Sequence, residues 1–135
     1  NKQAGDLAWE ERGQGMRPAD PSAHGDIVLA RKDAPASYHL ASTLDDANMG
    51  VTHVVRGADL IASTDVHRLL QALLGLSTPT YRHHGLICGP DGKRLAKRDA
   101  AASLASLRAA GIDGLALADD LRAGRLPAGY SLQNP

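Results

Sequence analysis

The sequence predicts an α/β fold whose centre is a strand–helix–strand unit with parallel strands. A β-branched run bounded by glycines, residues 51–56, predicts the first strand. Apolar side chains at helical spacing predict a helix over 63–74, and residues 85–88 predict the next strand. Such an order forms a right-handed crossover between parallel strands. Parallel sheets are usually covered on both faces and contain more strands than this, so we expect half of an α/β domain.

Composition limits the class of protein. The chain has 135 residues, which is the size of one domain, and 15 basic and 15 acidic residues cancel to a formal net charge of zero. This balance argues against a polybasic nucleic-acid binder. The absence of Phe and an aromatic share of 3% leave Ala and Leu to fill the core, so little apolar area can be buried. No apolar run approaches the roughly 20 residues of a membrane span.

The part before the central unit is predicted to hold one loop, one strand and one helix. Residues 1–25 carry several glycines and prolines without a regular period, which indicates a loop. Residues 26–31 contain a short apolar run, ended by Asp33 and Pro35, and predict a strand. Residues 38–48 place apolar side chains on one face and predict a helix, which Gly50 ends.

The part after the first strand is predicted to be mostly helical. Ser63 is expected to cap the central helix and Gly75 to end it. Residues 89–92, Gly-Pro-Asp-Gly, predict a turn. Asp99 is expected to cap a helix that runs to about residue 110, and a short helix over 115–121 and an irregular tail should follow.

These elements predict three parts of a single α/β domain. They are a loop-like opening segment over 1–25, an α/β core over 26–98 and a helical tail over 99–135. The chain begins at Asn1 without an initiator Met or the apolar region of a signal peptide. We therefore expect it to be the later portion of a domain whose first strands are missing.

Two candidate sites follow strands of the predicted sheet. Arg56 ends the first strand of the central unit, and its planar fork of N–H groups suits a carboxylate. Asp59 is the alternative partner, in a purely structural ion pair. Residues 93–98 carry four cations after the Gly-rich turn and could hold a triphosphate, or they could form a solvated charged loop. Ligands of open α/β sheets bind beyond the carboxyl ends of the strands, so both are expected at one edge.

Other polar residues give weaker signals. Tyr38 could hydrogen-bond a polar substrate or could be a packed tyrosine with a satisfied hydroxyl. Asp45 and Asp46 are adjacent on a helix and do not face each other, which argues against a two-carboxylate mechanism. Residues 83–84 are two histidines on opposite faces of a strand, so with Cys88 they make a poor metal site. Cys88 is expected to be an inert core thiol.

Taken in order, three segments resemble the catalytic domain of glutamyl-tRNA synthetases, which are class I aminoacyl-tRNA synthetases. The resemblance covers roughly residues 25–110. Its segments are Ser37-Tyr38-His39-Leu40-Ala41 with Asp45-Asp46, Gly50-Val51-Thr52-His53-Val54-Val55-Arg56-Gly57-Ala58-Asp59, and Gly89-Pro90-Asp91-Gly92-Lys93-Arg94-Leu95-Ala96-Lys97-Arg98. The last is similar to the family's Lys-Met-Ser-Lys-Ser loop. The resemblance implies a cytoplasmic ligase, and it implies that this chain is the C-terminal half of a Rossmann-like α/β catalytic domain.

One branch of the family is favoured by residues 56–60. Their Arg-Gly-Ala-Asp-Leu is similar to glutamyl-Q tRNA(Asp) synthetases, whereas standard glutamyl-tRNA synthetases tend to have Arg-Gly-Glu-Asp-His. The resemblance implies that L-glutamate is activated with ATP and attached to the queuosine base of tRNA(Asp). A fragment of a standard glutamyl-tRNA synthetase and a non-catalytic nucleotide- or RNA-binding remnant are the alternatives.

The resemblance also assigns residues. It places Tyr38 and Arg56 at glutamate, and it makes Lys97 a catalytic residue that binds the ATP phosphates. Mg²⁺ is implied by the ATP, although no metal ligand can be named and no zinc ligands are expected.

The chain also departs from the family pattern. Arg94 and Ala96 replace a lysine and a serine of the loop, and the ATP-binding His-Ile-Gly-His element is absent. We therefore expect the isolated chain to be inactive.

Overall fold

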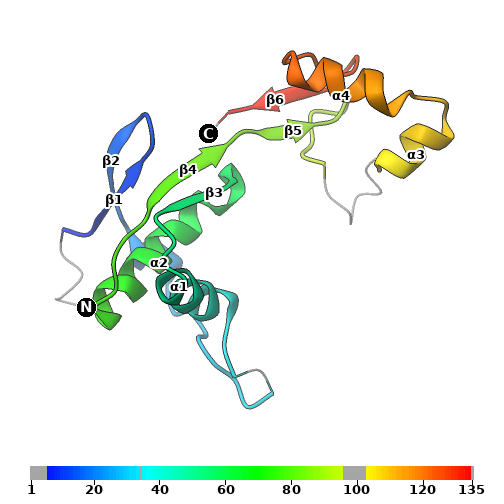
Figure 1. Ribbon diagram of the computed structural model, residues 1–135. Helices are drawn as coiled ribbons and strands as arrows, with labels where there is room; N and C mark the ends of the chain where they lie inside the picture. Colours follow the sequence, from blue (N-terminus) through cyan, green and yellow to red (C-terminus); the bar gives the residue numbers. More distant parts are fainter. Residues whose placement is uncertain (1–5, 34, 96–102, 135) are drawn as a thin grey trace. The chain divides into compact units, whose positions relative to one another are not determined.

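The computed structural model describes residues 6–33, 35–95 and 103–134. The chain divides into two compact units, Asn1–His84 and Gly85–Pro135. Within the described residues the first unit contains β1 (Ala8–Glu11), β2 (Gly15–Pro18), the 3₁₀ turn η1 (Pro21–His24), α1 (Tyr38–Asn48), β3 (His53–Gly57), the 3₁₀ turn η2 (Ala58–Leu60), α2 (Ile61–Leu74) and β4 (Thr80–His84) (Figure 1). The second contains β5 (Leu86–Cys88), α3 (Leu104–Ala109), α4 (Gly114–Arg122) and β6 (Ser131–Gln133).

The first unit is a mixed sheet with helices beside it. Its described strands lie in the order β2-β1-β4-β3. β3 and β1 are both parallel to β4, whereas β1 and β2 form an antiparallel hairpin. α2 connects β3 to β4, which makes the predicted parallel crossover. The prediction of an α/β fold with parallel strands is therefore confirmed.

The two helices have clear boundary signals. α1 occupies the predicted residues because the Ser37 side chain accepts a hydrogen bond from the backbone N–H of Leu40 at 3.3 Å. α2 ends where predicted, since Gly75 takes a left-handed conformation with φ of 67°. The expected cap at Ser63 is wrong: α2 already begins at Ile61, because η2 runs directly into it.

The core of this unit is small and unusually polar. Its buried apolar side chains include Trp9 and Tyr81, whose rings meet edge to face with centroids 5.6 Å apart. The Trp9 indole Nε1–H donates to Asp65 Oδ1 at 2.9 Å. Among the described residues of this unit, the buried polar side chains are Glu11, Thr43, Thr64, His67, Gln71 and His83.

The second parallel strand lies earlier in the chain than predicted. It is β4, at Thr80–His84, and not the apolar run at 85–88. β4 reads Tyr-Arg-His-His after its first residue, and only Tyr81 and His83 of these are buried. A strand that buries one polar face lacks the continuous apolar signal on which the prediction relied. The apolar run forms β5 instead, in an antiparallel pair with β6.

The opening segment is also more ordered than predicted. The supposed loop over 1–25 contains the β1–β2 hairpin and η1. In contrast, residues 26–30 have no regular secondary structure, so the strand expected over 26–31 is wrong. Instead, Ile27 and Leu29 line the wall of a pocket of about 550 Å³ against the apolar face of α2.

The second unit combines a two-stranded sheet with two short helices. Asp113 caps α4 by accepting from the backbone N–H of Leu115 at 2.8 Å, which agrees with the helix predicted over 115–121. α3 begins after the cap Ser103, later than the expected start at Asp99, which lies outside the described residues. The tail is not wholly irregular, because β6 forms there.

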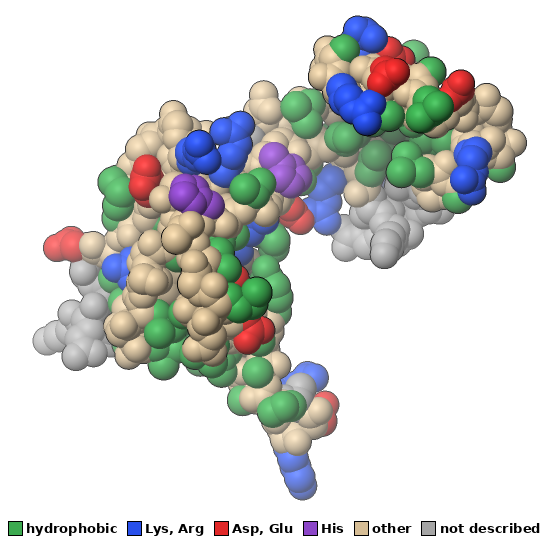
Figure 2. Space-filling model, in the orientation of Figure 1, with side chains coloured by type: hydrophobic (Ala, Val, Ile, Leu, Met, Phe, Trp, Pro, Cys, Tyr) green, Lys and Arg blue, Asp and Glu red, His purple; other side chains and the backbone are tan. Residues whose placement is uncertain are grey.

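Apolar burial in the second unit is slight. Figure 2 shows hydrophobic side chains at its surface, and Leu104 and Leu115 are 73% and 79% exposed. Cys88 is buried. Across both units, no helix among the described residues is long and apolar enough to cross a membrane.

Candidate functional site

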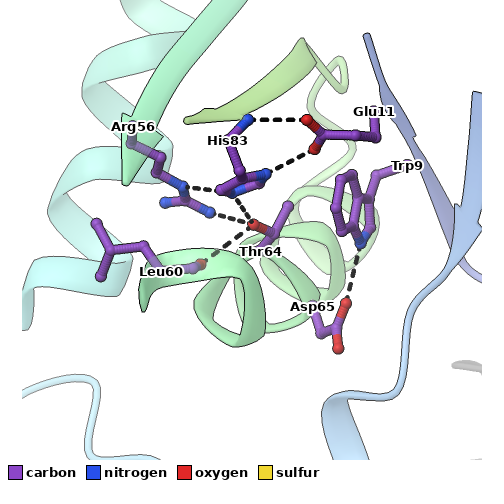
Figure 3. A network of polar contacts seen from close by, with 7 residues as sticks. All are labelled: Trp9, Glu11, Arg56, Leu60, Thr64, Asp65 and His83. Carbon is purple, nitrogen blue, oxygen red and sulfur yellow. Dashed lines mark hydrogen bonds and ion pairs between the residues drawn. The ribbon is translucent and has the colours of Figure 1, made fainter. Parts of the chain in front are cut away.

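Arg56 lies at the carboxyl end of β3 and is the centre of a polar network in the first unit (Figure 3). Its Nε–H donates to His83 Nε2 at 3.2 Å, and its Nη1 lies 3.3 Å from His67 Nδ1. Its Nη2 donates to Thr64 Oγ1. The guanidinium carbon also lies 5.2 Å from the centre of the Tyr81 ring. Four residues from β4 and α2 therefore hold one cationic side chain.

β1 contributes a buried carboxylate to this network. Glu11 Oε1 accepts from the backbone N–H of His83 at 2.8 Å, and Glu11 Oε2 lies 2.6 Å from His83 Nδ1. Both side chains are almost fully enclosed. Because the carboxylate can only accept, the His83 proton lies on Nδ1, and Nε2 is free to accept from Arg56.

A second histidine chain leads from Arg56 toward α1. His67 Nε2 and His39 Nδ1 are 3.0 Å apart. Since an Arg N–H can only donate, His67 accepts at Nδ1 and carries its proton on Nε2, toward His39. The Tyr38 ring packs on both imidazoles, with ring centroids 5.6 Å from His39 and 5.7 Å from His67. Tyr38 is itself 57% exposed, so it forms an accessible wall of the site.

The surroundings of Arg56 keep these histidines neutral. Burial lowers the pKa of His67 to about 4, and the Arg56 charge acts in the same direction. Burial also lowers the pKa of His83, although Glu11 opposes this shift. The pKa of His39 is lowered too, chiefly by burial. Arg56 is thus held by neutral acceptors, and its positive charge is available to an anionic ligand.

The structure brings some of the residues singled out in the sequence close to Arg56. Tyr38 and Arg56 are brought together through His67. Burial raises the pKa of Asp46, and the charge of Arg56 acts against this shift. His83 is buried and His84 exposed, as expected for neighbours on a strand. No group of three or more metal-ligating side chains occurs among the described residues.

The Gly-rich turn forms part of the second unit. The backbone N–H of Gly92 donates to Gly89 O at 2.9 Å, and the N–H of Lys93 donates to Asp91 Oδ1 at 3.1 Å. Gly92 has a φ of 72°, which explains glycine at this position. Lys93 and Arg94 are exposed. Lys97, the predicted phosphate-binding residue, lies outside the described residues.

Sequence reasoning missed Glu11, Thr64 and His67 as members of the site. Glu11 lies in a segment that was predicted to be a loop, and 72 positions separate it from His83. No local sequence signal reveals the pair, because the buried faces of β1 and β4 carry polar residues and their alternation in burial appears only in the structure.

This arrangement defines a class of protein. It is an α/β protein with an arginine at the carboxyl end of a parallel strand, where open α/β sheets bind their ligands. The neutral surroundings of that arginine suit a carboxylate.

Comparison with known proteins identifies the family. The family model "tRNA synthetases class I (E and Q), catalytic domain" matches residues 3–124. The chain therefore belongs to the class I tRNA synthetases of this group, and the resemblance seen in the sequence is confirmed.

The relatives are longer proteins. A glutamyl-Q tRNA(Asp) synthetase of Rhodobacter capsulatus is 58% identical over 89 residues, which are 66% of this chain and 32% of that protein. One from Symbiobacterium thermophilum is 47% identical over 106 residues, 78% of this chain and 33% of that protein. The chain thus spans about a third of the length of these curated relatives.

A solved structure is also similar. A glutamate tRNA ligase from Elizabethkingia meningosepticum, in complex with its amino acid, matches with a TM-score of 0.59 and 34% identity. The match covers 69% of this chain and 19% of that one. It agrees with the α/β fold assigned above.

Proposed function

We propose that this chain supplies part of the active site of a glutamyl-Q tRNA(Asp) synthetase. Such an enzyme activates L-glutamate with ATP and transfers it to the queuosine base of tRNA(Asp). The observation that carries the proposal is the Arg56 guanidinium, held by neutral side chains beside an exposed tyrosine. The names of relatives at 58% and 47% identity support the queuosine-specific branch.

In this proposal Arg56 binds a carboxylate of glutamate and Tyr38 forms an accessible wall of the glutamate site. The α-carboxylate of glutamate attacks the α-phosphorus of ATP, one P–O bond forms, and the bond to the leaving pyrophosphate breaks. No protein nucleophile is needed, so positioning and electrostatic stabilisation supply the rate enhancement. Lys97 is assigned to the ATP phosphates as a catalytic residue.

The proposed roles of Arg56, Tyr38 and Lys97 do not include binding of Mg²⁺. ATP-dependent enzymes usually bind the metal through the phosphates and one or two carboxylates. Among the described residues no cluster of three or more His, Cys, Asp or Glu side chains could hold it.

A standard glutamate–tRNA ligase is the second candidate. Glutamate–tRNA ligase 2 of Jannaschia sp. is 40% identical over 111 residues, or 82% of this chain and 25% of that protein. The two candidates share glutamate activation and differ in the RNA acceptor. The experiment must therefore test the acceptor separately.

A segment exchange tests the proposal. The 89 residues of this chain that match the Rhodobacter capsulatus relative replace their counterparts in it, and exchange between ATP and pyrophosphate is measured with and without L-glutamate. We expect glutamate-dependent exchange, loss of it in the Arg56→Ala hybrid, and at least a hundredfold lower turnover in Lys97→Ala. Exchange that ignores glutamate would disprove the assignment. A folded hybrid that binds ATP without any exchange would favour a non-catalytic binding module.

The acceptor is tested with the same hybrid. We expect glutamate to be transferred to tRNA(Asp) that carries queuosine and not to tRNA(Asp) from cells that lack it. Equal transfer to both, or transfer to tRNA(Glu), would favour the standard ligase.

A further inference from the structure

We propose that Glu11 and His83 are positioning residues, which fix the Arg56 guanidinium for a ligand carboxylate. The proposal rests on the proposed function of Arg56 as a glutamate-binding residue. It assigns a role to two buried polar side chains that lie behind Arg56 in the core of the first unit (Figure 3).

The first step is the fixed orientation of His83. Glu11 uses both carboxylate oxygens on this one residue, with one on the backbone N–H at 2.8 Å and the other on Nδ1 at 2.6 Å. The imidazole also stacks on the Tyr81 ring, with an angle of 8° between the planes. Rotation of the buried ring would break the contact of Nδ1 with Glu11 and that of Nε2 with Arg56. His83 therefore presents Nε2 to Arg56 in a single tautomer.

The second step is the use of the arginine donors. An Arg side chain has five N–H groups. Within the described part of the chain, His83, His67 and Thr64 accept from one each. One N–H remains on Nη1 and one on Nη2. Two N–H groups on neighbouring terminal nitrogens match the two oxygens of a carboxylate.

The third step explains why an imidazole lies between Glu11 and Arg56. A carboxylate in direct contact with Arg56 would form the paired hydrogen bonds that the ligand needs and would compete with it. Placed behind a neutral imidazole, Glu11 strengthens His83 as an acceptor and leaves the arginine charge to the ligand. Carboxylates behind metal-binding histidines act in the same way, and their removal typically costs tenfold to a hundredfold in affinity.

Nuclear magnetic resonance of the chain tests the positioning itself. Nitrogen spectra report the His83 tautomer, and the Arg56 Nε–H signal reports exchange with water. We expect His83 protonated at Nδ1 and a slowly exchanging Arg56 Nε–H. Glu11→Gln should give a mixture of tautomers and at least tenfold faster Nε–H exchange. Glu10→Gln is the matched control, since Glu10 is the exposed neighbour on β1. If Glu11→Gln unfolds the chain, the same two signals are compared in Glu11→Asp.

Ligand binding provides the second readout. His83→Gln keeps an oxygen that can accept from Arg56, whereas His83→Leu does not. Calorimetry with L-glutamate should show about tenfold tighter binding to His83→Gln than to His83→Leu. If both variants bind equally while wild type binds glutamate, the positioning role is wrong. If wild type binds no glutamate, the proposed function of Arg56 loses its support, and the resonance experiment still decides the positioning: an unchanged tautomer and unchanged exchange in Glu11→Gln overturn it.

Discussion

At the scale of single residues, Arg56 is a partly buried cation whose described hydrogen-bond acceptors are all neutral. Its acceptors are two imidazoles and a hydroxyl, each of which is a weaker partner than a carboxylate. The energetic balance favours an anionic ligand, because such a ligand replaces water at the remaining N–H groups and gains the full charge–charge attraction. Burial and the Arg56 charge also lower the pKa of His39, His67 and His83, so these side chains stay neutral.

The low pKa of His67 predicts a pH-dependent stability. Its folded pKa of about 4 lies below the ordinary value of 6.5, so the unfolded chain binds more protons between these pH values. Stability should then rise by about 2 kcal/mol from pH 5 to pH 7 through this residue. His39 and His83 shift in the same direction, and Asp46, with a raised pKa, opposes them at the acidic end. Urea unfolding followed by Trp9 fluorescence measures the effect.

His67→Gln should flatten this pH dependence, because an amide does not titrate in the range. His53→Gln, at an exposed position on β3, is the control and should retain the wild-type slope. Equal slopes in wild type and His67→Gln would contradict the prediction.

Thr64 provides a second test at this scale. Its side chain is fully buried, it accepts from Arg56, and its hydroxyl lies 3.3 Å from Leu60 O. Thr64→Val keeps the shape and leaves an Arg56 N–H without its acceptor, so we expect a loss of about 1 to 3 kcal/mol of stability. Thr64→Ser retains the hydroxyl and should lose less. The two variants are compared by their free energies of urea unfolding at pH 7. A Val variant as stable as the Ser variant would show that this hydrogen bond does not contribute to stability.

At the scale of elements, α1, α2 and the strand β3 could be predicted from local signals, whereas β1, β2 and β4 could not. α1 has its cap at Ser37 and a glycine at residue 50, and its predicted bounds were correct. β4 could not be found because its buried face carries Tyr81 and His83, whose burial depends on β1 and α2. The hairpin at 8–18 was hidden by its own glycines, which look like loop residues.

Of the candidate site, the sequence predicted Arg56 and Tyr38 but not the buried side chains that contact Arg56. Arg56 and Tyr38 stand in segments that resemble the family, and the structure connects them through His67. Glu11 and His83 form a contact across 72 positions, which no local pattern encodes. Strand geometry argued against a metal site at His83, but nothing in the sequence indicated that the residue pairs with a carboxylate.

The end of α2 yields a prediction about an element boundary. Gly75 has a φ of 67°, and a Cβ added there would meet no heavy atom within 4 Å. Gly75→Ala therefore tests backbone strain alone and should cost about 1 kcal/mol. Asn tolerates this conformation better, so Gly75→Asn should cost less. Urea unfolding monitored by Trp9 fluorescence measures both, and equal stability of Ala and wild type would contradict the left-handed cap.

At the scale of the whole molecule, the two units differ in how much they bury. The first unit holds Trp9, Val66, Leu70 and Tyr81 in its interior, whereas Cys88 is the one buried apolar side chain among the described residues of the second. Since apolar burial is the main favourable contribution to folding, the second unit should be the less stable of the two. Local opening free energies commonly differ between such units.

The sequence supplies one probe for each unit, because it contains a single Trp and a single Cys. Trp9 lies in the first unit and Cys88 in the second, and both side chains are buried. We expect Cys88 to become reactive toward a thiol reagent at a lower urea concentration than that at which Trp9 fluorescence changes. The Cys88→Ser variant, with no thiol to label, supplies the background for the reagent and shows whether the Trp9 transition is unaffected by the probe. Coincident midpoints, with equal dependence on urea, would mean that the two units unfold as one cooperative structure and that the sparse core of the second unit is stabilised by the first.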